Sequence, residues 1–110
     1  MLEEFKSAAR QPETPGYRRW FSDAVMELIV WYSPTGVVRG FQLCYDGDGR
    51  ERAFTWHVEA GMAHTATDGA PRADLVLAQF QERSARLDPP LAALVTRKLE
   101  EYDRSHPAPL

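Results

Sequence analysis

The residues that could act as a nucleophile and its base are Cys44 and His57. A cysteine thiolate is a nucleophile, and a histidine within hydrogen-bond reach can take the thiol proton. That chemistry needs a cation or a helix N-terminus near the sulfur, whereas the sequence places Cys44 within a strand, opposite Glu51. We therefore interpret Cys44 as a packing residue and expect no catalytic residue, which favours a non-enzymatic function.

His57 and His64 are candidate metal ligands, with Glu59 or Asp68 as a third. Imidazole and carboxylate groups are common zinc ligands. However, the spacing matches none of the familiar helical zinc motifs, and histidines are also ordinary strand and loop residues. We expect no metal site and no cofactor.

Residues 46–50, with the sequence DGDGR, have the composition of the start of a calcium-binding loop. The EF-hand pattern requires an oxygen ligand at its fifth position, which is Arg50, and glycine at its sixth, which is Glu51. Both requirements fail. Because Asp-Gly pairs are strong turn formers, we interpret this segment as a hairpin turn.

Composition and charge argue against several partners and compartments. The net charge of -3 and the pI near 5.6 disfavour nucleic acid, although residues 17–21 interleave arginines with aromatic residues. No apolar run approaches the ~20 residues that span a bilayer, and the acidic N-terminus is unlike a secretory signal. Cys44 is the single cysteine, so no intramolecular disulfide can form. We expect a cytoplasmic protein that binds neither nucleic acid nor membrane.

Strands must position most of these side chains, because residues 17–58 have the composition of a sheet. Turn-forming residues separate stretches rich in β-branched and aromatic residues, and such short loops predict an antiparallel meander. Apolar residues then recur at helical spacing in 71–103, where Asp88 and two prolines divide two helices. The sequence therefore predicts one α+β domain, a four-stranded antiparallel β-meander packed on one face by two C-terminal helices. The four predicted strands are 17–21, 25–32, 37–45 and 50–58.

The remaining segments of the domain are expected to be peripheral. The apolar pattern in residues 1–10 predicts a short amphipathic helix with Leu2 and Phe5 on one side. The prolines and glycine that follow predict a linker up to residue 16. Residues 59–69 predict a loop, and residues 104–110 a tail.

A register for the sheet follows from two assumed turns. A four-residue loop at 33–36 puts Tyr32 opposite Val37, and a two-residue turn at 47–48 puts Tyr45 opposite Arg50. Since side chains alternate between the two faces, this register gathers apolar residues on one face, which we take as the core. The predicted core face holds Tyr17, Phe21, Met26, Leu28, Val30, Tyr32, Val37, Phe41, Leu43, Tyr45, Phe54, Trp56 and Val58.

The opposite face is mixed, partly polar and partly aromatic, and it is where we expect a ligand or partner to bind. The register puts Glu27 between Arg18 and Gln42, and it puts Val38 between Trp31 and His57. Convergent polar groups from adjacent strands are typical of small-molecule pockets, whereas tryptophans on an open sheet favour association. The candidate ligand- or partner-binding residues are Arg18, Trp20, Glu27, Trp31, Gln42 and His57.

Four sequence strings span most of the predicted sheet: RRWF at 18–21, ELIVW at 27–31, GFQLCYD at 40–46 and FTW at 54–56. Together they resemble a family of small, uncharacterised bacterial proteins of unknown function. The resemblance covers roughly residues 17–58. It implies a bacterial source and a small stand-alone domain, but it implies no activity and no catalytic residues.

Two classes of function remain open from the sequence. The first is an interaction module that associates through the mixed face, with a protein partner or with itself as a homodimer. The alternative is a small-molecule-binding domain, or a modest enzyme, that uses Glu27, Gln42 and His57. No motif in the sequence names a substrate.

Overall fold

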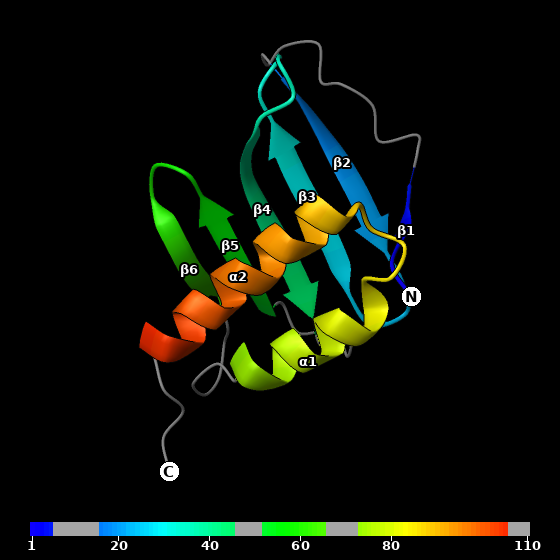
Figure 1. The fold of residues 1–110 in the computed structure, drawn as a ribbon, viewed down its shortest axis with the longest axis vertical. Coiled ribbons are helices and arrows are strands. Elements are labelled where there is room, and N and C mark those ends of the chain that lie inside the picture. The colour runs from blue at the N-terminus through cyan, green and yellow to red at the C-terminus, as the bar shows by residue number, and fades with distance from the viewer. Residues whose placement is uncertain (6–15, 46–51, 66–72, 106–110) are drawn as a thin grey trace.

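An antiparallel sheet and two helices packed on one of its faces make up the structure (Figure 1). The computed structural model describes residues 1–5, 16–45, 52–65 and 73–105. Within these residues six strands follow one another across the sheet in chain order, each antiparallel to the next. The elements are β1 (Glu3–Glu4), β2 (Tyr17–Ser22), β3 (Glu27–Tyr32), β4 (Val38–Tyr45), β5 (Arg52–His57), β6 (Gly61–Thr65), α1 (Ala73–Arg83) and α2 (Pro89–Ser105).

The predicted α+β class, antiparallel sheet and two C-terminal helices are confirmed, but the predicted number of strands is wrong. The described part of the chain has six strands because a short strand is added at each edge of the predicted four. β1 lies where a helix was expected, and β6 lies within the expected loop. Residues 61–65 are poor in β-branched and aromatic residues, so only their hydrogen bonding to β5 reveals the strand.

Every predicted hairpin is out of register by an even number of residues, four between β2 and β3 and two in each of the next two hairpins. Leu28 lies opposite Leu43 rather than Phe41, and Tyr45 lies opposite Arg52 rather than Arg50. The turns are longer than we assumed. Because the shift is even, most side chains stay on the predicted face.

An irregularity between Trp31 and Tyr32 changes the faces locally. It brings Val38 opposite Tyr32, and Val38 then packs against the core instead of lying on the opposite face. Val37 and Val58, both predicted to lie in the core, are 58% and 47% exposed because they lie in turns beyond the strand ends.

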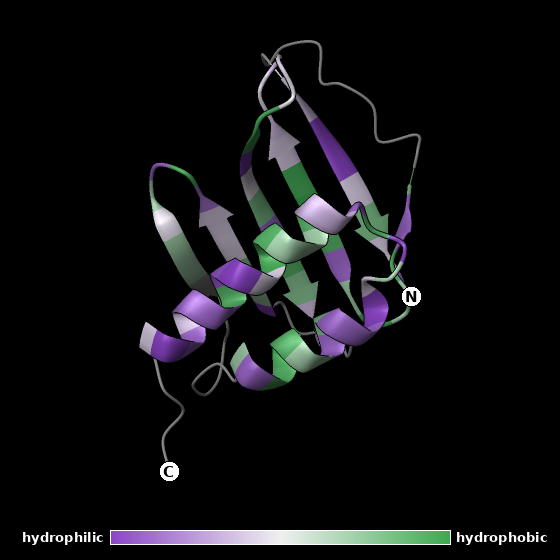
Figure 2. Ribbon diagram, viewed as in Figure 1, coloured by the Kyte–Doolittle hydropathy of each residue, from purple (hydrophilic) through white to green (hydrophobic). Residues whose placement is uncertain are grey.

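The core is the layer between the sheet and the two helices. Phe21, Leu28, Phe41 and Phe54 are buried on the sheet side, and the buried stripe of α2 includes Leu99. Figure 2 shows apolar segments of the sheet lying behind both helices. Both helices therefore cover the same face of the sheet, which we call the inner face.

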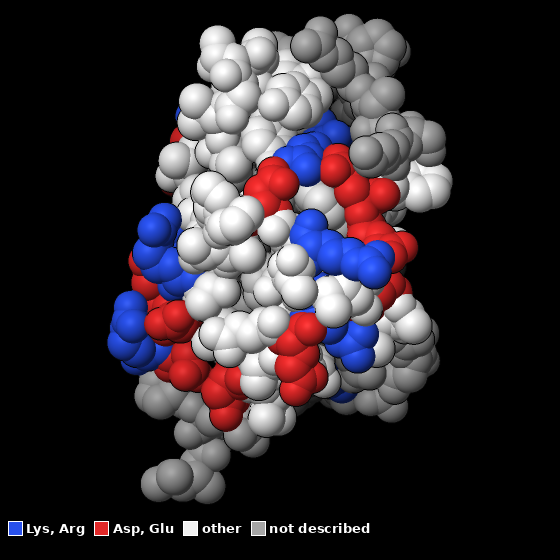
Figure 3. Space-filling view, turned by 45° about the vertical axis from the view of Figure 1, so that its right-hand side comes forward, with Lys and Arg blue, Asp and Glu red and all other residues white. Residues whose placement is uncertain are grey.

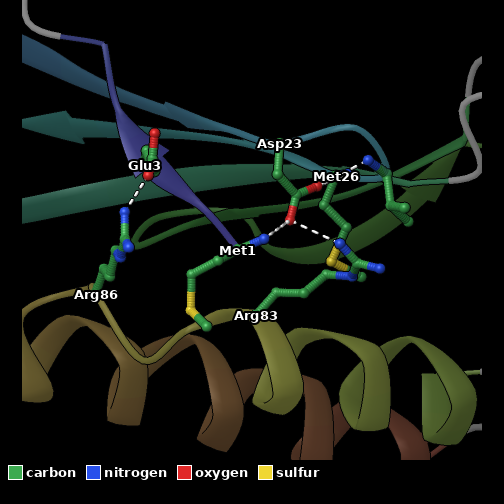
Figure 4. A network of polar contacts seen from close by, with 7 residues as sticks. Met1, Glu3, Asp23, Met26, Arg83 and Arg86 are labelled. Atoms are coloured by element: carbon green, nitrogen blue, oxygen red, sulfur yellow. Dashed lines mark hydrogen bonds and ion pairs between the residues drawn. The ribbon is translucent and has the colours of Figure 1, made fainter.

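Asp23 ties the turn between β2 and β3 to the helical layer (Figure 4). Its Oδ1 atom accepts hydrogen bonds from the backbone N–H groups of Val25 (2.7 Å) and Met26 (2.8 Å). Its Oδ2 atom accepts a hydrogen bond from Nη1 of Arg83 at 2.8 Å and lies 3.1 Å from the amino group of Met1. The side chain is only 6% exposed. Burial opposes ionisation of this carboxyl, but these hydrogen bonds outweigh burial and hold the pKa of Asp23 well below its ordinary value.

The first residues of the chain are held between β2 and the end of α1. Leu2 is fully buried in the core, and its N–H donates to the carbonyl of Arg83 at 2.9 Å. Glu3 pairs with Arg86 just beyond α1 (Figure 4). Phe5 is 59% exposed, so the predicted amphipathic pairing of Leu2 and Phe5 is wrong.

Arg19 joins three elements on the inner side of β2. Two of its nitrogens, Nε and Nη2, donate to the carboxylate of Glu4 at 2.9 and 2.8 Å, and Nη1 donates to Asp88 at 2.7 Å. The hydrogen bonds to Glu4 raise the pKa of Arg19 against the opposing effect of burial. Figure 3 shows acidic and basic side chains interspersed in the view toward this edge. The charges here link β1, β2 and the start of α2.

We predict that Asp23→Asn lowers the free energy of unfolding near pH 7 by about 1.5–3 kcal/mol, because a charged hydrogen-bond acceptor is lost beside Arg83. The folded-state pKa of Asp23 lies below the unfolded value of about 3.9, so its stabilising effect is full above that value. The effect is lost as the pH falls through the folded-state pKa.

Urea unfolding between neutral and acidic pH measures this effect. The wild-type protein should lose stability in acid more steeply than Asp23→Asn. Glu100→Gln, at an exposed position on α2, is the matched control and should follow the wild type. Identical pH profiles for Asp23→Asn and the wild type would show that the ion pair contributes nothing.

Candidate functional site

The face of the sheet opposite the helices, which we call the outer face, carries the candidate residues in rows that run across the strands. One row of paired residues lies near the turn between β3 and β4, and two more follow toward the other end of the strands. From β2 to β5, the rows are Arg18, Trp31, Gly40 and His57; then Trp20, Ile29, Gln42 and Thr55; then Ser22, Glu27, Cys44 and Ala53.

A groove of about 670 Å³ opens on the outer face at the row that contains Trp31. Its walls come from β2, β3, β4 and β5 and from the turns next to them. We call it the Trp31 groove and define it by Arg18, Trp31, Arg39, Thr55, His57 and Glu59. The sheet thus brings residues far apart in sequence to one concave surface.

Gly40 lies between Trp31 and His57 in the row beside the groove. A Cβ atom at Gly40 would lie 2.5 Å from the carbonyl oxygen of Trp56, and 3.3 Å from both Cα and Cδ2 of His57. The imidazole therefore leans over the place where another residue would have a side chain. The close approach of β5 to β4 at this point requires glycine.

The backbone of Glu59 selects the tautomer of His57, and its side chain forms an ion pair. The N–H of Glu59 donates to Nδ1 of His57 at 3.3 Å, so a neutral imidazole carries its proton on Nε2. The Glu59 carboxylate accepts a hydrogen bond from Arg39 at 2.7 Å. Both members of this ion pair are exposed, at 42% and 74%, and their charges cancel at the rim of the groove.

Among the described residues that line the groove, Arg18 is the cation without a carboxylate partner. Its guanidinium lies over the ring of Trp20, with 5.4 Å between the central carbon and the ring centroid. Its Nε atom is buried, and no described residue accepts a hydrogen bond from it. Within the described residues, no carboxylate pairs with Arg18.

A second aromatic group lies at the same end of the sheet. The rings of Tyr17 and Tyr32 stack with centroids 4.8 Å apart and planes 5° apart, and both residues line the groove. Burial raises the pKa of the Tyr32 hydroxyl above its ordinary value, although Arg19, which donates to that hydroxyl, opposes the shift.

The structure brings together three of the six candidate residues, Arg18, Trp31 and His57. Trp20 contacts Arg18 but does not line the groove, and Gln42 lies in the next row. The predicted neighbours of Glu27 are wrong. Glu27 lies between Ser22 and Cys44, and Gly40 rather than Val38 separates Trp31 from His57. A four-residue shift between β2 and β3 explains the first error, and a two-residue shift between β3 and β4 explains the second.

Sequence reasoning missed Arg39 and the glycine at position 40 as parts of the site, and it considered Glu59 only as a metal ligand beside His57. The position of Arg39 could have revealed a break in the strand pattern, because the predicted register put this cation on the core face among apolar residues. A charge at such a position indicates a local break in alternation, and the irregularity at Trp31 supplies that break. Glu59 follows β5 in a turn, where no periodic pattern applies.

The structure does not support Cys44 as a nucleophile with His57 as its base. Cys44 lies opposite Glu27 and Ala53, so its neighbour is a carboxylate as expected, although not Glu51. Cys44 and Gly40, the partner of His57, are four residues apart on β4, which is about 13 Å. The thiol and the imidazole are therefore too far apart for proton transfer.

Among the described residues, no cluster of three or more His, Cys, Asp or Glu residues could hold a metal ion. Asp68 and residues 46–51 lie outside the described residues. Neither described helix is long and apolar enough to cross a membrane.

Comparison with known proteins gives no match to a family model, to a curated protein or to a solved structure. The function must therefore be inferred from the geometry of the outer face.

We predict that Gly40→Ala lowers the free energy of unfolding by about 1–3 kcal/mol, because its methyl group would overlap the carbonyl oxygen of Trp56. Urea unfolding at constant pH measures the change. Thr55→Ala, on the neighbouring strand of the same face, is the control and should cost less. A Gly40→Ala protein as stable as the wild type would mean that β4 and β5 can separate at this point without cost.

Proposed function

We propose that the protein is a small-molecule-binding domain whose site is the Trp31 groove. The observation that carries this proposal is the convergence of Arg18, Trp31 and His57 from three strands on one concave surface. An aromatic surface with a few convergent polar groups is the usual make-up of a ligand site. The volume of about 670 Å³ lies within the range of such sites.

The position of the groove on the sheet favours binding. Trp31 and His57 project from strand positions that are paired on both sides, and Arg18 projects from β2 opposite Trp31, so their backbone positions are held by the sheet before a ligand arrives. Sites built on strands are held more precisely than sites built on loops, and preorganisation reduces the entropic cost of binding.

The contacts in the groove favour binding over catalysis. Glu59 is engaged by Arg39, and Nδ1 of His57 already accepts a hydrogen bond. Of the three residues that the sequence indicated for a ligand site or enzyme, only His57 lines the groove, since Glu27 and Gln42 lie in other rows.

A screen of small soluble fragments by two-dimensional amide NMR tests this proposal. Bound fragments should shift the resonances of Trp31, Gly40 and His57 more than those of the inner face. We predict that Trp31→Ala lowers the affinity for the tightest-binding fragment by about twofold to tenfold, because an aromatic stacking surface is lost.

Gln42→Ala is the matched control for this screen, because Gln42 lies on the same face but outside the groove. The Gln42→Ala variant should bind the fragment with the same affinity as the wild type. Fragments that bind only elsewhere on the protein, or an unchanged affinity in Trp31→Ala, would refute the proposed site.

A second candidate function is association through the outer face, with a second copy of the chain as the partner. It is favoured by Trp20 and Ile29, which lie in the middle row of a face on which neither described helix packs. Two such faces can pack against each other as the sheets of a sandwich do. Trp20 and Ile29 would lie at the centre of that interface.

We predict that Ile29→Lys converts such a dimer to a monomer while the circular dichroism spectrum stays unchanged, because a charge would be buried at its centre. Native mass spectrometry measures the change. Ile29 does not line the Trp31 groove, so fragment binding should survive in the monomer. A wild-type protein that is monomeric up to its solubility limit would exclude this candidate.

A further inference from the structure

The charges that line the Trp31 groove do not balance. Arg39 and Glu59 neutralise each other at the rim, at 2.7 Å. Arg18 has no carboxylate partner among the described residues, and it lies partly buried against Trp20. A partly buried cation attracts an anion more strongly than one in water, because the surroundings screen less. The groove therefore offers one net positive charge to a ligand.

Several hydrogen-bond donors of the groove have no acceptor among the described residues. Arg18 has a buried Nε without a partner, and His57 presents an N–H at Nε2 when neutral. The indole of Trp31 is a further donor, and none of the described residues accepts from it. Ser33 is less available, since its hydroxyl already accepts from the backbone N–H groups of its own turn. A ligand that fits this lining must bring acceptors.

The shape of the lining restricts the rest of the ligand. Trp31 provides a flat aromatic surface in the groove. The stacked rings of Tyr17 and Tyr32 alternate to the inner side, where Tyr32 packs against the core, so they support the groove from behind. Aromatic rings pair best in offset-stacked or edge-to-face arrangements with other rings. Next to Trp31, Gly40 adds no side chain that would fill the space. A planar ring is the group that uses the surface of Trp31 best.

We propose that the ligand of the Trp31 groove is a planar aromatic molecule that carries an acidic group, with the anion bound by Arg18 and the ring stacked on Trp31. This inference rests on the proposed function and adds the chemical class of the ligand. A carboxylate or a phosphate would satisfy the same donors, because the arginine fork matches both.

Naphthalene-2-carboxylate and its neutral isostere naphthalene-2-carboxamide test the ligand class by calorimetric or NMR titration. The carboxylate should bind the wild-type protein about tenfold more tightly or better, since hydrogen bonds to charged groups are the stronger ones. Arg18→Gln should remove this difference between the two probes, and Arg18→Lys should retain part of it because it keeps the charge without the fork.

Arg97→Gln is the matched control, because Arg97 is exposed on α2. This variant should discriminate between the probes as the wild type does. Amide NMR spectra of each variant confirm that the fold is intact before any titration is interpreted. The Arg18→Lys variant keeps the test decisive if Arg18→Gln fails to fold.

The outcomes separate the ligand class from the site. Equal binding of the two probes, or undiminished discrimination in Arg18→Gln, would overturn the anionic class and leave the groove as a binding site. The same conclusion follows if neutral fragments bind in the groove and neither naphthalene probe does. If neither the probes nor any fragment binds there, the proposed function fails as well.

Discussion

The constraint on which the rest of the structure depends is that, in the described part of the chain, both helices cover the same face of a six-stranded sheet. Side chains alternate along each strand, so every strand contributes to both faces whether or not both are covered. The chain meets this constraint by placing large apolar residues such as Phe21, Leu28 and Phe41 on the inner face. The outer face is left to residues that tolerate water or need a partner, and that division creates the candidate site.

The concave part of the outer face arises where the alternation breaks. The irregularity at Trp31 and the close approach of β4 and β5 at Gly40 lie in the same row of the sheet. Together they move Val38 to the inner side and leave Trp31 and His57 on either side of a residue without a side chain. A regular sheet with an ordinary residue at position 40 would present a flatter surface here.

The sequence predicted the class, the two helices and the face of most strand residues, because these depend on periodicity and turn chemistry. It did not predict β6, since Gly61 and Met62 have weak strand propensity and are held in place by hydrogen bonds to β5. Nor did it fix which residues lie in one row across the sheet. A shift in register by an even number of residues changes no side chain's face but changes every neighbour. The four-residue shift between β2 and β3 therefore separates Glu27 from Arg18, although both were assigned to the correct face.

The contacts of β1 have a consequence for the order in which the chain folds. From β2 to β6, each strand pairs with the next one in sequence, so the sheet can grow by short loop closures, which are fast. β1 is different, because its neighbours include both β2 and the far end of α1, where Arg83 and Arg86 lie about eighty residues away. Its docking can be completed only after the helices have packed on the sheet. With two paired residues in its ladder, β1 should also be the first strand to open, so its amides should exchange with solvent before those of the central strands.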